Sequence, residues 1–123
     1  MITWKNMDTL AAYQELQAAP KVNVAEAMSG ENGAQRVKNY MVPMGAGMNF
    51  NYGARPVDDT ILSLLAKFAQ EQQMVEKFAE LYNGAVINTG EKRMVLHHLC
   101  RGQLGNEVSA DGVNKRDFYL NEL

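Results

Sequence analysis

His97, His98 and Cys100 are the residues of this sequence whose types and spacing most suggest chemistry. They lie in the stretch INTGEKRMVLHHLCRGQ, residues 87–103, and they are the only histidines and the only cysteine among 123 residues. Histidine is the side chain whose ordinary pKa lies nearest to neutral pH. Such a group suggests either a metal ion bound by nitrogen and sulfur ligands, or a thiol nucleophile with a histidine as its base.

A predicted helix would separate these side chains. Asn88 followed three residues later by Glu91 resembles a capping box, so we expect a helix to begin there and continue through the apolar residues that follow. At about 100° per residue, the two histidines lie opposite an apolar arc. Adjacent helical residues diverge and do not converge on one ion as an i, i+4 pair does, so we expect no metal site. The apolar arc consists of Val95, Leu96, Leu99 and Cys100.

Cys100 lies on this arc and is expected to pack as a small hydrophobic residue. A nucleophilic thiol needs an electropositive, partly exposed setting, which the arc does not provide. We therefore expect no catalytic, cofactor-binding or metal-binding residue in this chain, and no cofactor. His97 and His98 are expected to form hydrogen bonds at the edge of a packed helix. The arc is so wide that it needs more covering surface than a small domain supplies.

A second pattern that suggests a site is the glycine pair Gly45 and Gly47. Residues 48–52 alternate apolar residues with asparagines, as in a half-buried strand, and residues 40–42 form a second strand pattern. A G-x-G pair can belong to a phosphate-binding loop, but here it connects strand to strand rather than strand to helix. We predict a small β-hairpin with a tight turn and no phosphate site.

Composition indicates one globular domain in the cytoplasm. Hydrophobic residues make up 46 % of the chain, charged residues 21 %, and the net charge is −2. Such a charge predicts no nucleic-acid partner. The single cysteine fits a reducing compartment. No signal peptide is visible, and no segment approaches the roughly 20 apolar residues that cross a membrane, so we expect no membrane partner.

Helical periodicity dominates the rest of the sequence. It predicts a mainly helical α+β fold with one small hairpin, formed by a single segment 1–123 without an internal boundary. Asp58 is the expected N-cap of a central helix, residues 71–73 separate it from the next helix, and Gly84 ends that one. The other helices are expected over residues 4–19, before Pro20, over a turn ending near Gly30, over residues 34–38, and from residue 114 onward.

Residues 50–101 resemble the N-terminal region of the glucose-6-phosphate isomerase family, where two helices precede the pattern G-E-x-I-N-x-T-E-x-R-A-V-L-H-x-A-L-R. The later SADGVNKRDFY is similar to the family's V-D-G-K-D-V and the helix that follows it. Ala85 and Met94 depart from the pattern, as packing variation would, and His98 has no counterpart. The matching positions are Gly84, Ile87, Asn88, Glu91, Arg93, Val95, Leu96, His97 and Arg101, and the leucine of the pattern falls one place after Leu99.

The resemblance implies an N-terminal fragment of an αβα sugar-isomerase (SIS) enzyme, because family members are several times longer. Such aldose-ketose isomerases interconvert glucose 6-phosphate and fructose 6-phosphate in glycolysis and gluconeogenesis. Their proton-transfer, ring-opening and phosphate-binding residues lie downstream of the matched region, and His97 corresponds to a histidine of the helix motif instead. The fragment is therefore expected to be structural and inactive alone.

The resemblance also implies partners. We expect the remainder of the isomerase chain to cover this segment, sugar phosphate to bind only the full-length enzyme, and the isolated fragment to self-associate through its apolar arc. The alternative is a free-standing helical module that derives from the family and acts in binding.

Overall fold

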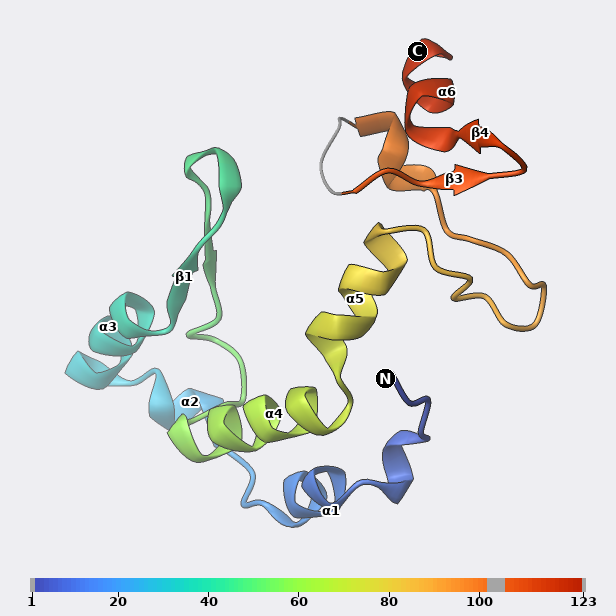
Figure 1. Ribbon diagram of the computed structural model, residues 1–123. Helices are drawn as coiled ribbons and strands as arrows, with labels where there is room; N and C mark the ends of the chain where they lie inside the picture. Colours follow the sequence, from blue (N-terminus) through green and yellow to red (C-terminus); the bar gives the residue numbers. More distant parts are fainter. Residues whose placement is uncertain (1, 102–105, 123) are drawn as a thin grey trace. The chain divides into compact units, whose positions relative to one another are not determined.

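The computed structural model describes residues 2–101 and 106–122 (Figure 1). The structure is about 53 % helical, which confirms the predicted mainly helical α+β class. Gly102 and Gln103, the last residues of the histidine-containing stretch, lie outside the described residues. The chain divides into two compact units: residues 5–71 form one, and the described residues of 1–4 and 72–123 form the other.

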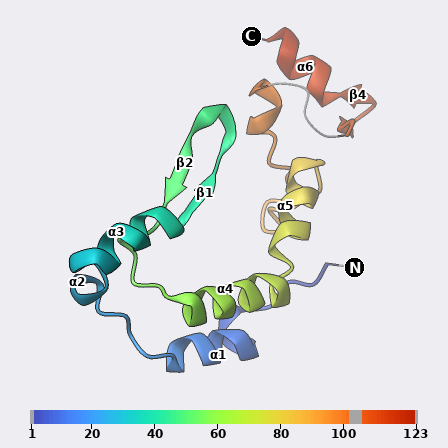
Figure 2. The same ribbon diagram turned by 90° about the vertical axis from the view of Figure 1, so that its left-hand side faces the viewer.

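In the unit of residues 5–71, helix α1 (Ala11–Ala18) packs along helix α4 (Asp59–Glu71), and the two lie side by side in Figures 1 and 2. A short 3-10 helix (Met7–Thr9) precedes α1. The contact buries Ala12 completely, and the Glu71 carboxylate accepts a hydrogen bond from the Ala12 amide at 3.0 Å. This bond satisfies one of the free amides at the start of α1, where no intrahelical acceptor exists.

The central helix begins and ends where the sequence predicts. The Asp58 carboxylate accepts a hydrogen bond from the Ile61 amide at 2.8 Å, as an N-cap does. Helix α4 ends at Glu71, and Gln73 has a left-handed φ of 51°, which separates it from helix α5 (Met74–Tyr82). Among the described residues, no helix is long and apolar enough to span a membrane.

Helices α2 (Val24–Ala27) and α3 (Gly30–Asn39) follow α1. Helix α3 begins at Gly30, four residues earlier than predicted. Gly30 was expected to end a helical turn, but it starts α3 instead, with a φ of +56° that glycine tolerates. A Cβ at Gly33 would lie 2.2 Å from the Met28 carbonyl oxygen. The glycine therefore permits the close approach of α3 to the end of α2.

The predicted hairpin is present. Strand β1 (Met41–Pro43) pairs antiparallel with β2 (Asn49–Asn51), and a 3-10 turn over Gly45–Gly47 joins them. All six strand residues are exposed. At the base of the hairpin, the Tyr40 hydroxyl donates to the Asp59 carboxylate at 2.9 Å, and partial burial together with this bond raises the pKa of Tyr40.

Arg36 holds α3 against the loop that leads from the hairpin to α4. Its side chain is 9 % exposed, and its guanidinium donates to the carbonyl oxygens of Gly53 at 2.6 Å, of Arg55 at 3.0 Å and of Val57. The guanidinium also lies over the Tyr40 ring, 4.3 Å from its centroid. The buried arginine therefore fixes a segment that has no regular structure.

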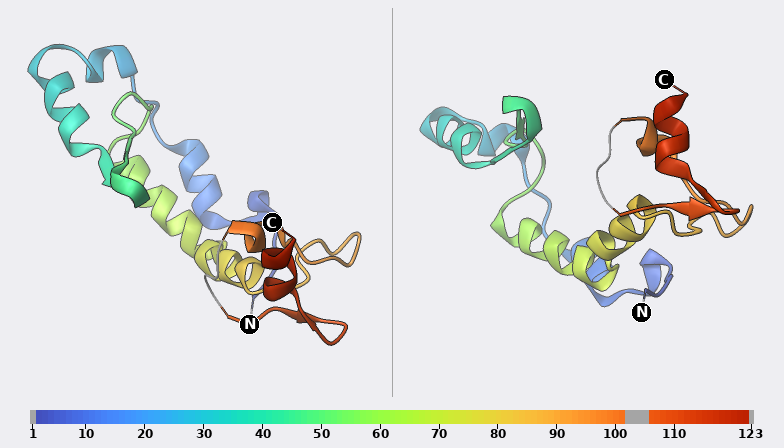
Figure 3. Two further views of the ribbon diagram at one scale, coloured as in Figure 1. Left: turned by 90° about the horizontal axis from the view of Figure 1, so that it is seen from above. Right: turned by 45° about the horizontal axis from the view of Figure 1, so that its top comes forward.

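In the other unit, α5 is followed by a loop, a 3-10 helix (His97–Arg101), strands β3 (Ser109–Ala110) and β4 (Val113–Asn114), and helix α6 (Lys115–Asn121). The β3–β4 hairpin is additional to the one the sequence predicts. The 3-10 helix packs on α6, as Figure 3 shows for the orange and red segments. Gly84 follows α5 with φ +79°, and a Cβ there would lie 2.4 Å from Cγ1 of buried Val108.

Candidate functional site

The stretch that carries the histidines begins with a closed turn and not with a helix. The Asn88 side chain accepts a hydrogen bond from the Glu91 amide and donates to the Glu91 carboxylate, both at 3.1 Å. However, the Arg93 amide bonds back to the Asn88 carbonyl at 3.1 Å, and Lys92 has a left-handed φ of 54°. The predicted helix over residues 88–96 is wrong, because the asparagine hydrogen bond of a helix cap supports a turn equally well.

The predicted apolar arc does not exist as one helical face. The 3-10 helix includes Leu99 and Cys100, but Val95 and Leu96 precede it in a segment without regular secondary structure. Leu99 is completely buried, whereas Val95 and Leu96 are partly exposed. Leu99 therefore belongs to the core of its unit, and the other two residues line a pocket.

His98 packs against the end of α5. Its Nε2 lies 2.9 Å from the carbonyl oxygen of Tyr82, and its ring stacks on the Tyr82 ring with 4.3 Å between centroids. The prediction of a hydrogen bond at the edge of a packed segment is confirmed for His98. With one ring nitrogen and one ring face occupied, His98 acts as a packing residue.

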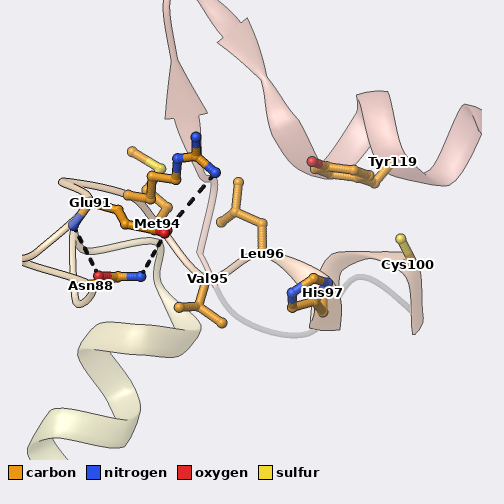
Figure 4. A pocket seen from close by; sticks show the side chains of 9 residues that line it. Asn88, Glu91, Met94, Val95, Leu96, His97, Cys100 and Tyr119 are labelled. Carbon is orange, nitrogen blue, oxygen red and sulfur yellow. Dashed lines mark hydrogen bonds and ion pairs between the residues drawn. The ribbon is translucent and has the colours of Figure 1, made fainter.

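His97 and Cys100 instead line a pocket of about 330 Å³ between the turn and helix α6 (Figure 4). The structure thus turns the adjacent histidines to different surroundings, as the sequence predicts, although a 3-10 helix rather than an α-helix does so. Among the described residues, no group of three or more histidine, cysteine, aspartate or glutamate side chains is arranged to hold a metal ion. The residues lining the pocket are Asn88, Glu91, Arg93, Met94, Val95, Leu96, His97, Cys100 and Tyr119.

The lining of the pocket mixes polar and apolar side chains. In Figure 4 the Glu91 carboxylate is linked both to Asn88 and to the Arg93 guanidinium, which lies 3.9 Å away. In the same view Leu96 lies between this polar cluster and the Tyr119 ring. Glu91 is already paired, and His97 is the one histidine among the residues that line this pocket.

Arg116 is a buried residue that sequence reasoning missed. It is 5 % exposed, its Nε donates to the Asn106 carbonyl, and its guanidinium donates to the Tyr82 carbonyl at 3.2 Å. The same Tyr82 carbonyl lies against His98. Arg116 therefore connects α6, the segment at Asn106 and the end of α5. The only sequence feature that pointed to this region was Asn114, a residue type favoured at the start of a helix. Its side chain caps α6 by accepting a hydrogen bond from the Arg116 amide at 3.0 Å.

Comparison with known proteins identifies relatives for nearly the whole chain. The family model described as phosphoglucose isomerase matches residues 51–117. The glucose-6-phosphate isomerase of Treponema denticola is 50 % identical over 98 % of this chain and 24 % of its own length. That of Treponema pallidum is 42 % identical over 98 % and 23 %, and that of Shewanella woodyi 40 % identical over 68 % and 15 %. The chain spans about a quarter of the length of these two Treponema relatives.

Proposed function

Because this chain belongs to the phosphoglucose isomerase family, we propose that residues 1–123 are one N-terminal segment of a glucose-6-phosphate isomerase. The complete enzyme interconverts glucose 6-phosphate and fructose 6-phosphate in glycolysis and gluconeogenesis, in the cytoplasm. The observation that carries the proposal is the 50 % identity to the Treponema denticola enzyme over 98 % of this chain, although the match covers only 24 % of that enzyme.

The segment has a structural part in the enzyme and no catalytic one. Isomerisation needs a base to move a proton between two carbons and further groups to open the sugar ring. In this chain Glu91 is paired with Asn88 and Arg93, and His98 is held against Tyr82. The sugar phosphate therefore binds only the complete enzyme, whose remaining polypeptide is the partner of this segment in an αβα sugar-isomerase fold.

A chimaera tests the proposal. This chain replaces the matching quarter of the Treponema denticola isomerase, and turnover of fructose 6-phosphate is followed in a coupled assay. We expect activity within about tenfold of the natural enzyme, since half of the residues are identical and no catalytic group is exchanged. A chimaera that is folded but inactive would contradict the proposal.

A free-standing binding module is the second candidate. The observation that favours it is the division into two compact units, each with buried residues of its own, such as Ala12 in one and Leu99 in the other. Sequencing the transcript beyond codon 123 separates the two candidates. Continuation into sugar-isomerase sequence supports the enzyme segment, and a stop codon supports the module.

A further inference from the structure

The β1–β2 hairpin presents one uniformly apolar face. Val42 lies opposite Phe50 in the register, and the Met44 amide donates to the Met48 carbonyl at 2.8 Å, so these two methionines are opposite each other as well. Because side chains alternate between the faces of a strand, these four residues share one face. The other face carries Met41 and Pro43 opposite two asparagines.

This face has the residue types of a buried surface but is exposed to solvent. The exposed fractions are 44 % for Val42, 51 % for Met44, 57 % for Met48 and 49 % for Phe50. In Figures 1 and 2 the hairpin projects beyond the end of α3, away from the other helices of its unit. Isolated two-stranded hairpins are at best marginally stable in water, so this one needs a covering layer.

The size of the face indicates what covers it. An aromatic side chain such as phenylalanine has about 200 Å² of surface. If that value is taken as the upper bound for each of the four residues, half-exposure leaves at most about 400 Å² on the face. A stable complex between separate molecules buries about 800 Å² on each partner. The face is therefore too small to hold a second copy of the chain tightly. It is large enough for a covalently continuous partner, whose effective concentration is high.

We propose that the apolar face of the hairpin, formed by Val42, Met44, Met48 and Phe50, docks against an apolar surface of the remaining isomerase polypeptide. This inference rests on the proposed function. The candidate partner is ample, because about three quarters of the length of the relatives has no counterpart in this chain. The two methionines suit such a contact, since their flexible side chains adapt to the opposing surface.

Neighbouring residues provide a matched test. Val42 and Met41 are adjacent and both 44 % exposed, but they lie on opposite faces of the hairpin. Val42→Lys and Met41→Lys are compared in the isolated chain and in the chimaera with the Treponema denticola isomerase. In the isolated chain, both substitutions should leave the circular dichroism spectrum and the urea midpoint unchanged, because both side chains already contact water.

In the chimaera, Val42→Lys should lower the thermal midpoint by about 4 °C or more, and Met41→Lys should change it by less than about 1 °C. Val42→Thr, which keeps the side-chain shape, should lower it in the same direction by less. Equal midpoints for the two lysine variants would overturn the proposal. So would a dimer of the isolated chain that persists below about 0.1 µM and that only Val42→Lys disperses, because a second copy would then occupy the face.

The outcome for the proposed function is read separately. An unsubstituted chimaera that is folded but inactive would contradict the proposed function, while the two thermal midpoints would still decide whether the face docks. An unsubstituted chimaera that does not fold would contradict both.

Discussion

Replacing Arg36 by methionine should destabilise the unit of residues 5–71 and leave its solvent-accessible surface nearly unchanged. The guanidinium donates to three main-chain carbonyl oxygens, those of Gly53, Arg55 and Val57, and is 9 % exposed. A hydrogen bond from a charged group contributes about 1.5 to 3 kcal/mol. The carbonyl of buried Gly53 is left without this donor, whereas the carbonyl of exposed Arg55 can regain water, and the methionine removes the cost of burying a charge. We therefore expect a net loss of about 3 kcal/mol in the free energy of unfolding.

Lysine does not replace this arginine. A lysine ammonium is a compact point charge and does not span acceptors that a planar guanidinium reaches together. Arg36→Lys should therefore lose about 2 kcal/mol, most of the effect of Arg36→Met.

The assay must resolve the two units, because they need not unfold together. Hydrogen exchange of the Arg55 and Val57 amides, which bond within the loop that Arg36 holds, reports on the affected segment. Both amides should exchange about a hundredfold faster in Arg36→Met, since 1.4 kcal/mol corresponds to a factor of ten. The control is Arg55→Met, which removes an exposed arginine from the same loop and should change stability by less than about 0.5 kcal/mol. If Arg36→Met and Arg55→Met had the same effect, the role assigned to Arg36 would be refuted.

Three further predictions concern packing, pH and association. Gly84→Ala should lower the unfolding free energy by about 2 kcal/mol in urea titrations, because a Cβ meets Val108 at 2.4 Å and φ is +79°; an unchanged midpoint would exclude this packing. Partial burial and the Asp59 carboxylate raise the pKa of Tyr40. The neutral Tyr40 hydroxyl therefore contributes its full stabilisation below the ordinary tyrosine pKa of about 10, and this stabilisation is lost as the pH rises through the raised pKa. Tyr40→Phe should remove this loss of stability at alkaline pH, and a loss that persists in the variant would show that another group causes it. The isolated chain should self-associate weakly above micromolar concentrations through its bare apolar faces, and a strict monomer in sedimentation equilibrium at about 100 µM would contradict this.

The parts of the fold that the sequence predicted depend on local signals. The Asp58 cap, the separation of α4 from α5 near Gln73, the end of α5 before Gly84 and the hairpin turn each follow from the preferences of a few adjacent residues. Such signals act within one turn of chain and need no distant partner. They were sufficient for the order and type of these elements.

The errors arise where one local signal supports two structures. Asn88 and Glu91 form the side-chain hydrogen bonds of a helix cap, yet the pairing of Asn88 with Arg93 closes a turn. The apolar arc predicted from that helix consequently placed Leu99 on a surface, where the structure buries it completely. The packing of the 3-10 helix on α6 is a tertiary contact, which these local signals do not contain.

The two buried arginines were beyond sequence reasoning for a different reason. Arg36 and Arg116 are charged residues in polar helical segments, which ordinarily face water. Their acceptors are main-chain carbonyls up to 21 residues away for Arg36 and 34 residues away for Arg116. Every residue has a main-chain carbonyl, so its use as an acceptor does not depend on residue type. No residue type in either loop therefore indicated that its carbonyl would bind a guanidinium.

Turnover by the chimaera is the measurement that tests the central claim most directly. Three proteins are compared in one coupled assay: the chimaera, the Treponema denticola isomerase with its matching segment deleted, and this chain alone. If the chain is a structural segment of an isomerase, the chimaera is active, and the other two proteins remain at the level of a blank. Turnover by the chain alone that is lost in His97→Ala would contradict the account, as would a folded chimaera without activity.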